Sequence, residues 1–206
     1  MNYPTSKQFI RLTNEGAHFS TVSHSENLDR KALQILLKLP QTPTLTQYLV
    51  LLKAVSHGPV FKHLMSLFSK GYLCAINHAI ELTSQPLETS LPLILKQLSD
   101  ENHCALADQE GFLLAHCGFN LNQAEQAAIL AVEISGLQTK RLHNIQGVSS
   151  TDLSFISIID DNGKSQLRFW PIHFNHQVLL LAIKGKPILE NTSFIQLTWQ
   201  LGQRYL

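Results

Sequence analysis

The sequence has few of the residues that form cross-links, metal sites or membrane spans. Its 206 residues include three cysteines, an odd number, and none of them stands in a Cys-x-x-Cys spacing. Only 15% of the residues are charged, and no apolar run approaches the roughly 20 residues that a membrane helix needs. The first residues lack the basic start and apolar core of a secretory leader. We therefore expect a cytoplasmic protein of a reducing compartment that does not insert into membranes.

Catalytic and metal-binding motifs are also missing. The sequence contains no GxSxG, Walker A, GxGxxG or HExxH pattern. It has ten histidines, but the closest groups, His57 with His63 and His173 with His176, lack neighbouring carboxylates or cysteines. The segment 160–163 begins like a calcium loop, yet Phe169 stands where that loop requires glutamate. The sequence predicts no metal, no cofactor and no enzymatic activity.

The cysteines leave two interpretations open. Cys104 and Cys117 flank a predicted hairpin and could face each other across it. Free thiols buried in the core, with Cys74 as the third, are the favoured alternative.

Charge is distributed unevenly between the two ends of the chain. The net charge is only +1, so nothing in the total favours nucleic acid or an anionic membrane. Residues 1–85 carry eight basic and four acidic side chains, whereas the rest carry eight basic and eleven acidic ones. Segment 83–92 is rich in serine, threonine and proline and is typical of a linker. We predict one domain over residues 1–85 and a second over residues 91–206.

The N-terminal part reads as a short hairpin followed by helices. Alternating residues predict strands at 8–12 and 17–22 that turn at 14–16. Three helices follow, each predicted from apolar residues at helical spacing. The first is capped by Asn27 or Asp29, the second is capped by Thr44, and the third begins at Pro59. Gly71 ends the third helix, and a strand follows at 72–76.

This order of helix, Thr-capped helix, helix, glycine and strand resembles a winged-helix domain. The resemblance implies DNA binding through the third helix, and the candidate contacts are Lys62, His63 and Lys70. Apolar side chains cover most of that helix, however, and a DNA-reading helix needs several donors and flanking cations. A buried helix in a small structural or protein-binding domain is the favoured interpretation.

The C-terminal part has a clearer pattern. A helix over 91–98 precedes two apolar runs around a turn at Asp108–Gly111, which is typical of a hairpin. An alanine-rich helix follows, capped by Asn120 or Asn122. Three strands are predicted at 153–159, 166–174 and 177–183, and a last helix is capped by Asn191 or Thr192.

The order αββαβββα, the hairpin run Cys104–Ala115 and the late strand Val178–Ile183 resemble the roadblock family of dynein light chain-like domains. Longin and profilin-like folds share much of this layout. The resemblance implies an α+β fold whose sheet carries helices on one face, and pairing through the long helix and an edge strand as a homodimer or heterodimer. It also implies a non-enzymatic scaffold or regulator, with a small Ras-like GTPase as a partner.

The candidate interface residues are small alanines on the long helix and two residues of a later strand. The alanines permit close helix approach, although they would equally let the helix pack flat on its own sheet. Proline inside the later strand is typical of an edge or a bulge. The predicted set is Ala124, Ala127, Ala128, Ala131, Arg168 and Trp170. The alternative function is a DNA-binding transcription regulator with a C-terminal dimerisation domain.

Overall fold

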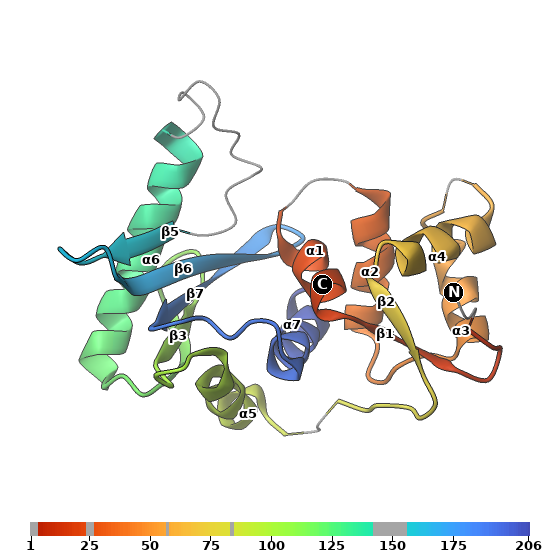
Figure 1. Cartoon of the computed structure of the whole chain (residues 1–206), viewed down its shortest axis with the longest axis horizontal. Coiled ribbons are helices and arrows are strands. Elements are labelled where there is room, and N and C mark those ends of the chain that lie inside the picture. The colour runs from red at the N-terminus through yellow and green to blue at the C-terminus, as the bar shows by residue number, and fades with distance from the viewer. Residues whose placement is uncertain (1–3, 24–26, 57, 83–84, 142–155) are drawn as a thin grey trace. The chain divides into compact units, whose positions relative to one another are not determined.

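The computed structural model describes residues 4–23, 27–56, 58–82, 85–141 and 156–206 (Figure 1). Within these residues the fold is mixed α+β, with seven α-helices and two antiparallel sheets. The α+β class predicted from the sequence is confirmed. Contacts within the chain divide it into two compact units, the first formed by Met1–Ser84 with Phe194–Leu206 and the second by Gln85–Ser193.

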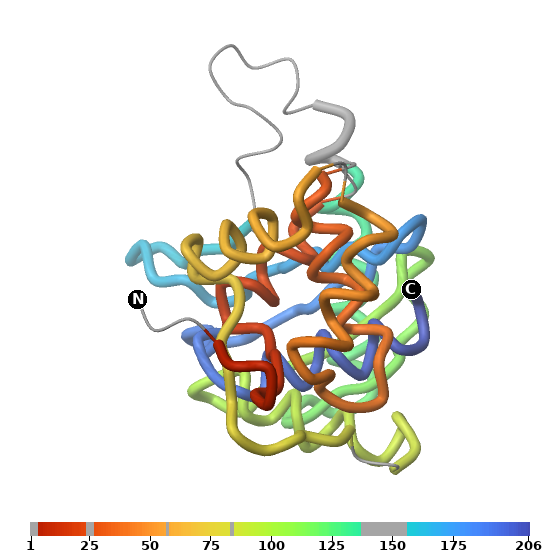
Figure 2. Tube along the Cα trace, turned by 90° about the vertical axis from the view of Figure 1, so that its right-hand side faces the viewer, coloured from red at the N-terminus to blue at the C-terminus, as the bar shows by residue number. Residues whose placement is uncertain are grey.

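The first unit contains a two-stranded sheet and helices that can be followed in Figure 2 from red at its first strand to yellow at its second. Its elements are β1 (Phe9–Leu12), α1 (Asn14–Thr21), α2 (Leu28–Lys38), α3 (Leu45–Leu52), α4 (Val60–Ser69), β2 (Leu73–Ile76) and most of α7 (Thr192–Tyr205). Two isolated β-bridges add to the pairing of β1 and β2: Gln41 pairs with Glu81, and Phe9 pairs with Thr44.

Side-chain caps start two of these helices at residues that the sequence singles out. The Asn27 side-chain oxygen accepts hydrogen bonds from the backbone N–H groups of Asp29 and Arg30, at 2.8 and 3.3 Å. Asn27 is therefore the cap of α2, and Asp29 is left to contact other side chains. Thr44 and Gln47 form a reciprocal capping box at the start of α3.

The predicted N-terminal hairpin is wrong. Residues 14–21 form helix α1, because the Thr13 hydroxyl accepts a hydrogen bond from the Gly16 N–H at 3.0 Å and caps it. Strand β1 pairs instead with the distant β2, and Leu12 lies opposite Leu73. Gly16 does not form a turn; it lets α1 pass close to the backbone of Tyr72. A Cβ at position 16 would lie 2.1 Å from the Tyr72 carbonyl oxygen.

The second unit is a five-stranded antiparallel sheet with the strand order β4-β3-β7-β6-β5. Helix α6 packs along the sheet against β3, β4, β6 and β7 (Figure 1). The elements in chain order are α5 (Leu87–Leu95), the 3₁₀ turn η1 (Lys96–Leu98), β3 (Cys104–Ala107), β4 (Leu113–Cys117), α6 (Leu121–Arg141), β5 (Ile156–Ile159), β6 (Ser165–Phe174) and β7 (Gln177–Lys184). Residues 153–155 of the first predicted late strand lie outside the described residues.

Local chemistry in this unit follows the sequence closely. The Asp108 carboxylate accepts hydrogen bonds from the N–H groups of Glu110 and Phe112, and Gly111 takes a φ of +91°. The predicted hairpin is thereby confirmed. Asn120 caps α6 by accepting a hydrogen bond from the Gln123 N–H at 2.9 Å, and the Gln123 side-chain oxygen accepts one from the Asn120 N–H.

Helix α7 differs from the domain boundaries predicted from the sequence. The prediction counted it as the last helix of the second domain, but the contacts assign Phe194–Leu206 to the first unit. The Trp199 indole N–H donates a hydrogen bond to the Leu39 carbonyl at 2.7 Å, and Phe194 stacks on His18 with ring centroids 4.1 Å apart. The N-terminal unit is thus completed by the last helix of the chain.

Candidate functional site

The four predicted interface alanines line the inner side of α6. Ala124, Ala127, Ala128 and Ala131 are all buried. Three of them form a core cluster with four sheet residues, namely Ala105, Phe169, Leu180 and Ala182. Their small side chains let α6 lie flat on its own sheet, which is the alternative that the sequence left open. Ala124, Ala128 and Ala131 are therefore not surface contacts in this unit, whereas Ala127 also lines a surface groove.

A shallow groove lies along one flank of α6, where the helix meets the sheet. Its volume is about 470 Å³, and its lining residues are Phe119, Asn122, Gln123, Gln126, Ala127, Ile129, Leu130, Glu133 and Leu167. Ile129 is 48% exposed, although it is a large apolar side chain. Glu133 is the one charged residue of this lining, so covering the groove would remove little charge from water.

Strand β5 forms one edge of the sheet beside this groove. In the described part of the chain it pairs with β6 alone, and Ile158 lies directly opposite Leu167. Since Leu167 lines the groove, Ile158 belongs to the same face of the sheet. Ile158 and Ile159 are 38% and 62% exposed. The open edge and the groove together form what we call the α6–β5 surface, namely Ile129, Leu130, Leu167 and Ile158.

The strand at the opposite edge of the sheet, β4, is contacted by a helix. Strand β4 is in contact with helix α5, whose Leu91 and Leu95 are buried. A strand flanked in this way is a poor template for another chain. Among the described residues the two edges of the sheet therefore differ, because a helix contacts β4 whereas β5 is paired on one side only.

Arg168 and Trp170 lie on the other face of the sheet. Their cross-strand partners are Ile183 and Leu181, whereas Phe169 between them points into the α6 core and is 3% exposed. The Arg168 guanidinium donates a hydrogen bond to the Gly185 carbonyl at 2.6 Å. The structure therefore does not bring these two residues together with the α6 surface.

The exposed members of the α6–β5 surface were not singled out from the sequence, although a signal exists. The alanines at 124, 127, 128 and 131 mark the inner stripe of a helix of period 3.6. Positions 126, 129 and 133 then lie on the exposed side and position 130 lies at the flank, where Leu130 is half-buried; two of these four residues are apolar. An alanine stripe on one side and large apolar residues on the other is the informative pattern.

Pro171 fits its place in the sheet. It pairs with Leu180 of β7, while the β5 pairing described on the other side of β6 ends at Phe169. The missing N–H of proline therefore interrupts no hydrogen bond of the β5–β6 ladder.

The three residues predicted for the DNA-binding alternative lie on or just after α4. His63 and Lys70 both contact Asp29 of α2, through His63 Nε2 at 2.9 Å and the Lys70 ammonium. The Ser56 hydroxyl lies 2.8 Å from His63 Nδ1. Lys62 is exposed and lines an open groove that also includes Asp29. Two of the three groups are thus engaged by a carboxylate, which weakens their use as phosphate contacts.

The Asp29 cluster, comprising Ser56, His63, Asp29 and Lys70, has a clear electrostatic character. Burial tends to raise the pKa of Asp29, but the hydrogen bonds and charges of Lys70 and His63 outweigh it and hold the pKa below its ordinary value. The carboxylate is therefore charged at neutral pH. The order Ser–His–carboxylate could relay a proton, but Lys70 already neutralises the carboxylate, and the contacts tie α2, α4 and the segment after α3 together.

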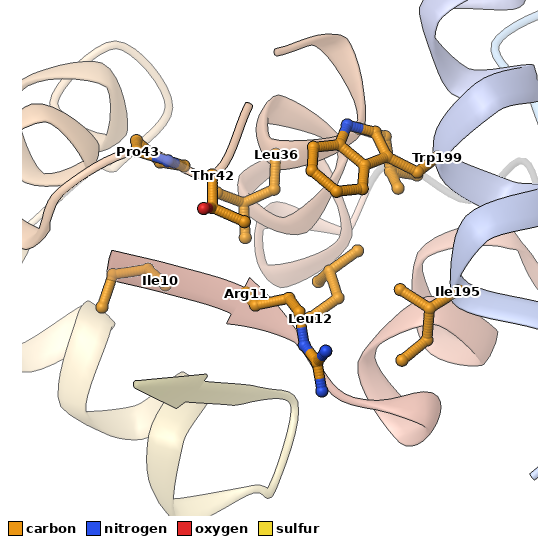
Figure 3. A pocket seen from close by; sticks show the side chains of 9 residues that line it. Ile10, Arg11, Leu12, Leu36, Thr42, Pro43, Ile195 and Trp199 are labelled. Atoms are coloured by element: carbon orange, nitrogen blue, oxygen red, sulfur yellow. The ribbon is translucent and has the colours of Figure 1, made fainter. Parts of the chain in front are cut away.

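A small apolar cavity lies in the first unit between β1, α2 and α7 (Figure 3). Ile195 and Trp199 of α7 form one wall, and Leu12 and Leu36 lie across from them. About 10 Å³ is open to the centre of a water molecule, which is room for roughly one water. The cavity is a packing gap rather than a ligand site.

Neither a metal cluster nor a membrane span is found where the chain is described. Among those residues no three histidine, cysteine, aspartate or glutamate side chains come together as metal ligands. No described helix combines the length and the apolar character needed to cross a bilayer.

The α6–β5 surface is the strongest candidate site. Comparison with known proteins assigns no function to it. No family model matches the chain, and no curated protein matches it. The assignment of a function therefore rests on the geometry described above.

Proposed function

We propose that the chain is a non-enzymatic scaffold or regulatory protein, and that its second unit pairs with a second copy through the α6–β5 surface. The sequence resemblance to roadblock domains suggests pairing through a long helix and an edge strand. The observation that carries the proposal is the position of exposed Ile129 beside the open edge of β5.

Two physical arguments support self-association over a chance apolar patch. A two-fold axis beside β5 would set its strand against the same strand of a second copy, and the backbone groups of both edges would be paired. The same axis would cover Ile129, Leu130 and Ile158 with the equivalent residues. Each buried apolar residue of this size contributes about 1.5–3 kcal/mol when it is fully removed from water.

The resemblance also suggests the class of partner. Roadblock-like domains often accompany small Ras-like GTPases, and we propose that such a GTPase, or another protein, binds the paired form. The first unit has exposed apolar residues of its own, since Phe61 is 58% and Val50 is 60% exposed. These residues make protein contact a better use of the first unit than DNA contact.

The experiment is a measurement of self-association with a matched pair of variants. Sedimentation equilibrium of the full chain at micromolar concentration should show a dimer. Ile129→Glu should raise the dissociation constant by about 100-fold, because it places a charge in the interface. Leu121→Glu is the control, since Leu121 lies on the same helix, is 59% exposed and is outside the groove.

Leu121→Glu should leave the dissociation constant within about twofold. Both variants should keep the circular dichroism spectrum of the parent. A strict monomer at high micromolar concentration, or equal weakening by both substitutions, would overturn the proposal.

A further inference from the structure

Two of the three cysteines face each other across the β3–β4 hairpin. Cys104 and Cys117 are direct partners in the antiparallel register. Directly opposed residues of an antiparallel pair have Cα atoms about 4.5–5.5 Å apart, which lies within the range that a disulfide spans. The register therefore places the two Cα atoms within the span of a disulfide.

The two thiols have different surroundings. Cys104 is fully buried, and its strand is held on both sides, by β4 and by β7. Cys117 is half-buried on the outer strand. An external reagent therefore reaches Cys117 first, and Cys104 is placed to react next.

The pKa shifts of the two thiols also favour Cys117 as the first to react. The hydrogen bond from Cys104 lowers the pKa of Cys117 against the effect of burial, and the positive charge of Lys96 adds to this. The same contact and burial raise the pKa of Cys104. A thiolate is the form of cysteine that attacks disulfides, so the accessible thiol is also the more nucleophilic one.

We propose that Cys104 and Cys117 form a redox-active dithiol, in which Cys117 reacts with low-molecular-weight disulfides and Cys104 resolves the product. The inference is independent of the proposed pairing, because neither cysteine belongs to the α6–β5 surface.

The reaction has two exchange steps and balances with oxidised glutathione as the oxidant. The Cys117 thiolate attacks one glutathione sulfur, a mixed disulfide forms, and the first glutathione thiolate leaves. The Cys104 sulfur then attacks the Cys117 sulfur, and its proton passes to the second glutathione thiolate as that group leaves. The two protein thiols are oxidised by two electrons, and glutathione disulfide is reduced to two glutathiones.

The test uses the full chain in glutathione redox buffers, with acid quenching, alkylation and peptide mass mapping. We expect wild-type protein to lose about 2 Da and to yield a Cys104–Cys117 linked peptide, because the mixed disulfide is resolved. The oxidised form should melt at least about 3 °C higher, because the bond closes a loop of the unfolded chain. Cys74→Ser is the matched control, since Cys74 is a half-buried cysteine of the first unit, and it should behave like the wild type.

The two single variants separate the roles. Cys104→Ser should stop at a stable glutathione adduct on Cys117. Cys117→Ser should leave Cys104 unmodified over the time in which the wild type reacts fully. The proposal is overturned if the wild type accumulates the adduct, links two chains, or stays reduced in a buffer that oxidises the urea-unfolded chain.

Discussion

Helices α4 and α6 each turn one side to their own unit and the other to solvent, and the two outer sides differ. On α4 the polar groups find partners within the chain, because Asp29 contacts both His63 and Lys70. On α6 the apolar residue Ile129 is 48% exposed, and the nearby strand β5 pairs on one side only in the described part of the chain. Helix α4 also leaves an apolar side chain in solvent, because Phe61 is 58% exposed. The strand edge near α6, and not exposed apolar area alone, is therefore the reason to place self-association on α6.

The largest effect should come from enlarging the inner side of α6. Ala131→Leu adds three carbon atoms where the native side chain is 0% exposed and packs in the core cluster. Overpacking of this kind costs about 1–3 kcal/mol, and we expect the upper end because Ala131 has no solvent-facing side. Urea unfolding followed by circular dichroism measures the change.

Gln126→Leu is the control for that prediction. Gln126 is an exposed residue on the outer side of the same helix. The substitution should change the free energy of unfolding by less than about 0.5 kcal/mol and should strengthen self-association. Equal destabilisation by the two variants would mean that the inner and outer sides of α6 are misassigned.

A smaller effect should follow from breaking the Asp29 cluster of the first unit. Asp29→Asn leaves Lys70 and His63 without their carboxylate, and the His63 side chain is only 14% exposed. We expect a loss of about 1–2 kcal/mol, less than for a buried ion pair because the Lys70 side chain is 47% exposed. Glu81→Gln, an exposed carboxylate of the same unit, should change stability by less than about 0.5 kcal/mol. If both variants unfold at the same urea concentration, the cluster does not stabilise the unit.

The success of the sequence predictions varied with how local the deciding interactions are. The caps at Asn27, Thr44 and Asn120 and the turn at Asp108–Gly111 depend on neighbouring residues, and all of them are found in the structure. Segment 17–22 was predicted as a strand because its residues alternate, yet the Thr13 cap and the close approach of Gly16 to Tyr72 favour a helix. That approach joins residues far apart in the chain, so a local pattern cannot reveal it.

The candidate site shows the same limit. The sequence pointed to α6 and to its alanines, but not to which side of the helix faces the sheet. Alanines suit either a partner helix or the protein's own sheet, and only the strand order decides between them. The assignment of α7 to the first unit was likewise beyond local pattern, because it rests on contacts such as that of Trp199 with Leu39.

The smallest predicted effect is a pH dependence of stability, which should come from His18 and not from Asp29. His18 stacks on Phe194, and burial lowers its pKa to about 4 despite the opposing charge of Glu15. The unfolded chain binds this proton at its ordinary pKa of 6.5, so folding is favoured above pH 6.5 and loses this contribution as the pH falls toward 4. At pH 5 we expect a loss of about 1 kcal/mol, after allowance for the partial exposure of the ring.

Asp29 should not contribute to that loss. Its pKa lies below the ordinary value of 3.8, so its stabilising charge is present above that pH and disappears only as the pH falls further. His18→Gln should therefore remove most of the difference in unfolding free energy between pH 7 and pH 5, whereas Asp29→Asn should leave that difference unchanged. Urea titrations of the three proteins at both pH values test this. An undiminished difference in His18→Gln would show that another group carries the acid sensitivity and that the stacked ring is not held in its neutral form.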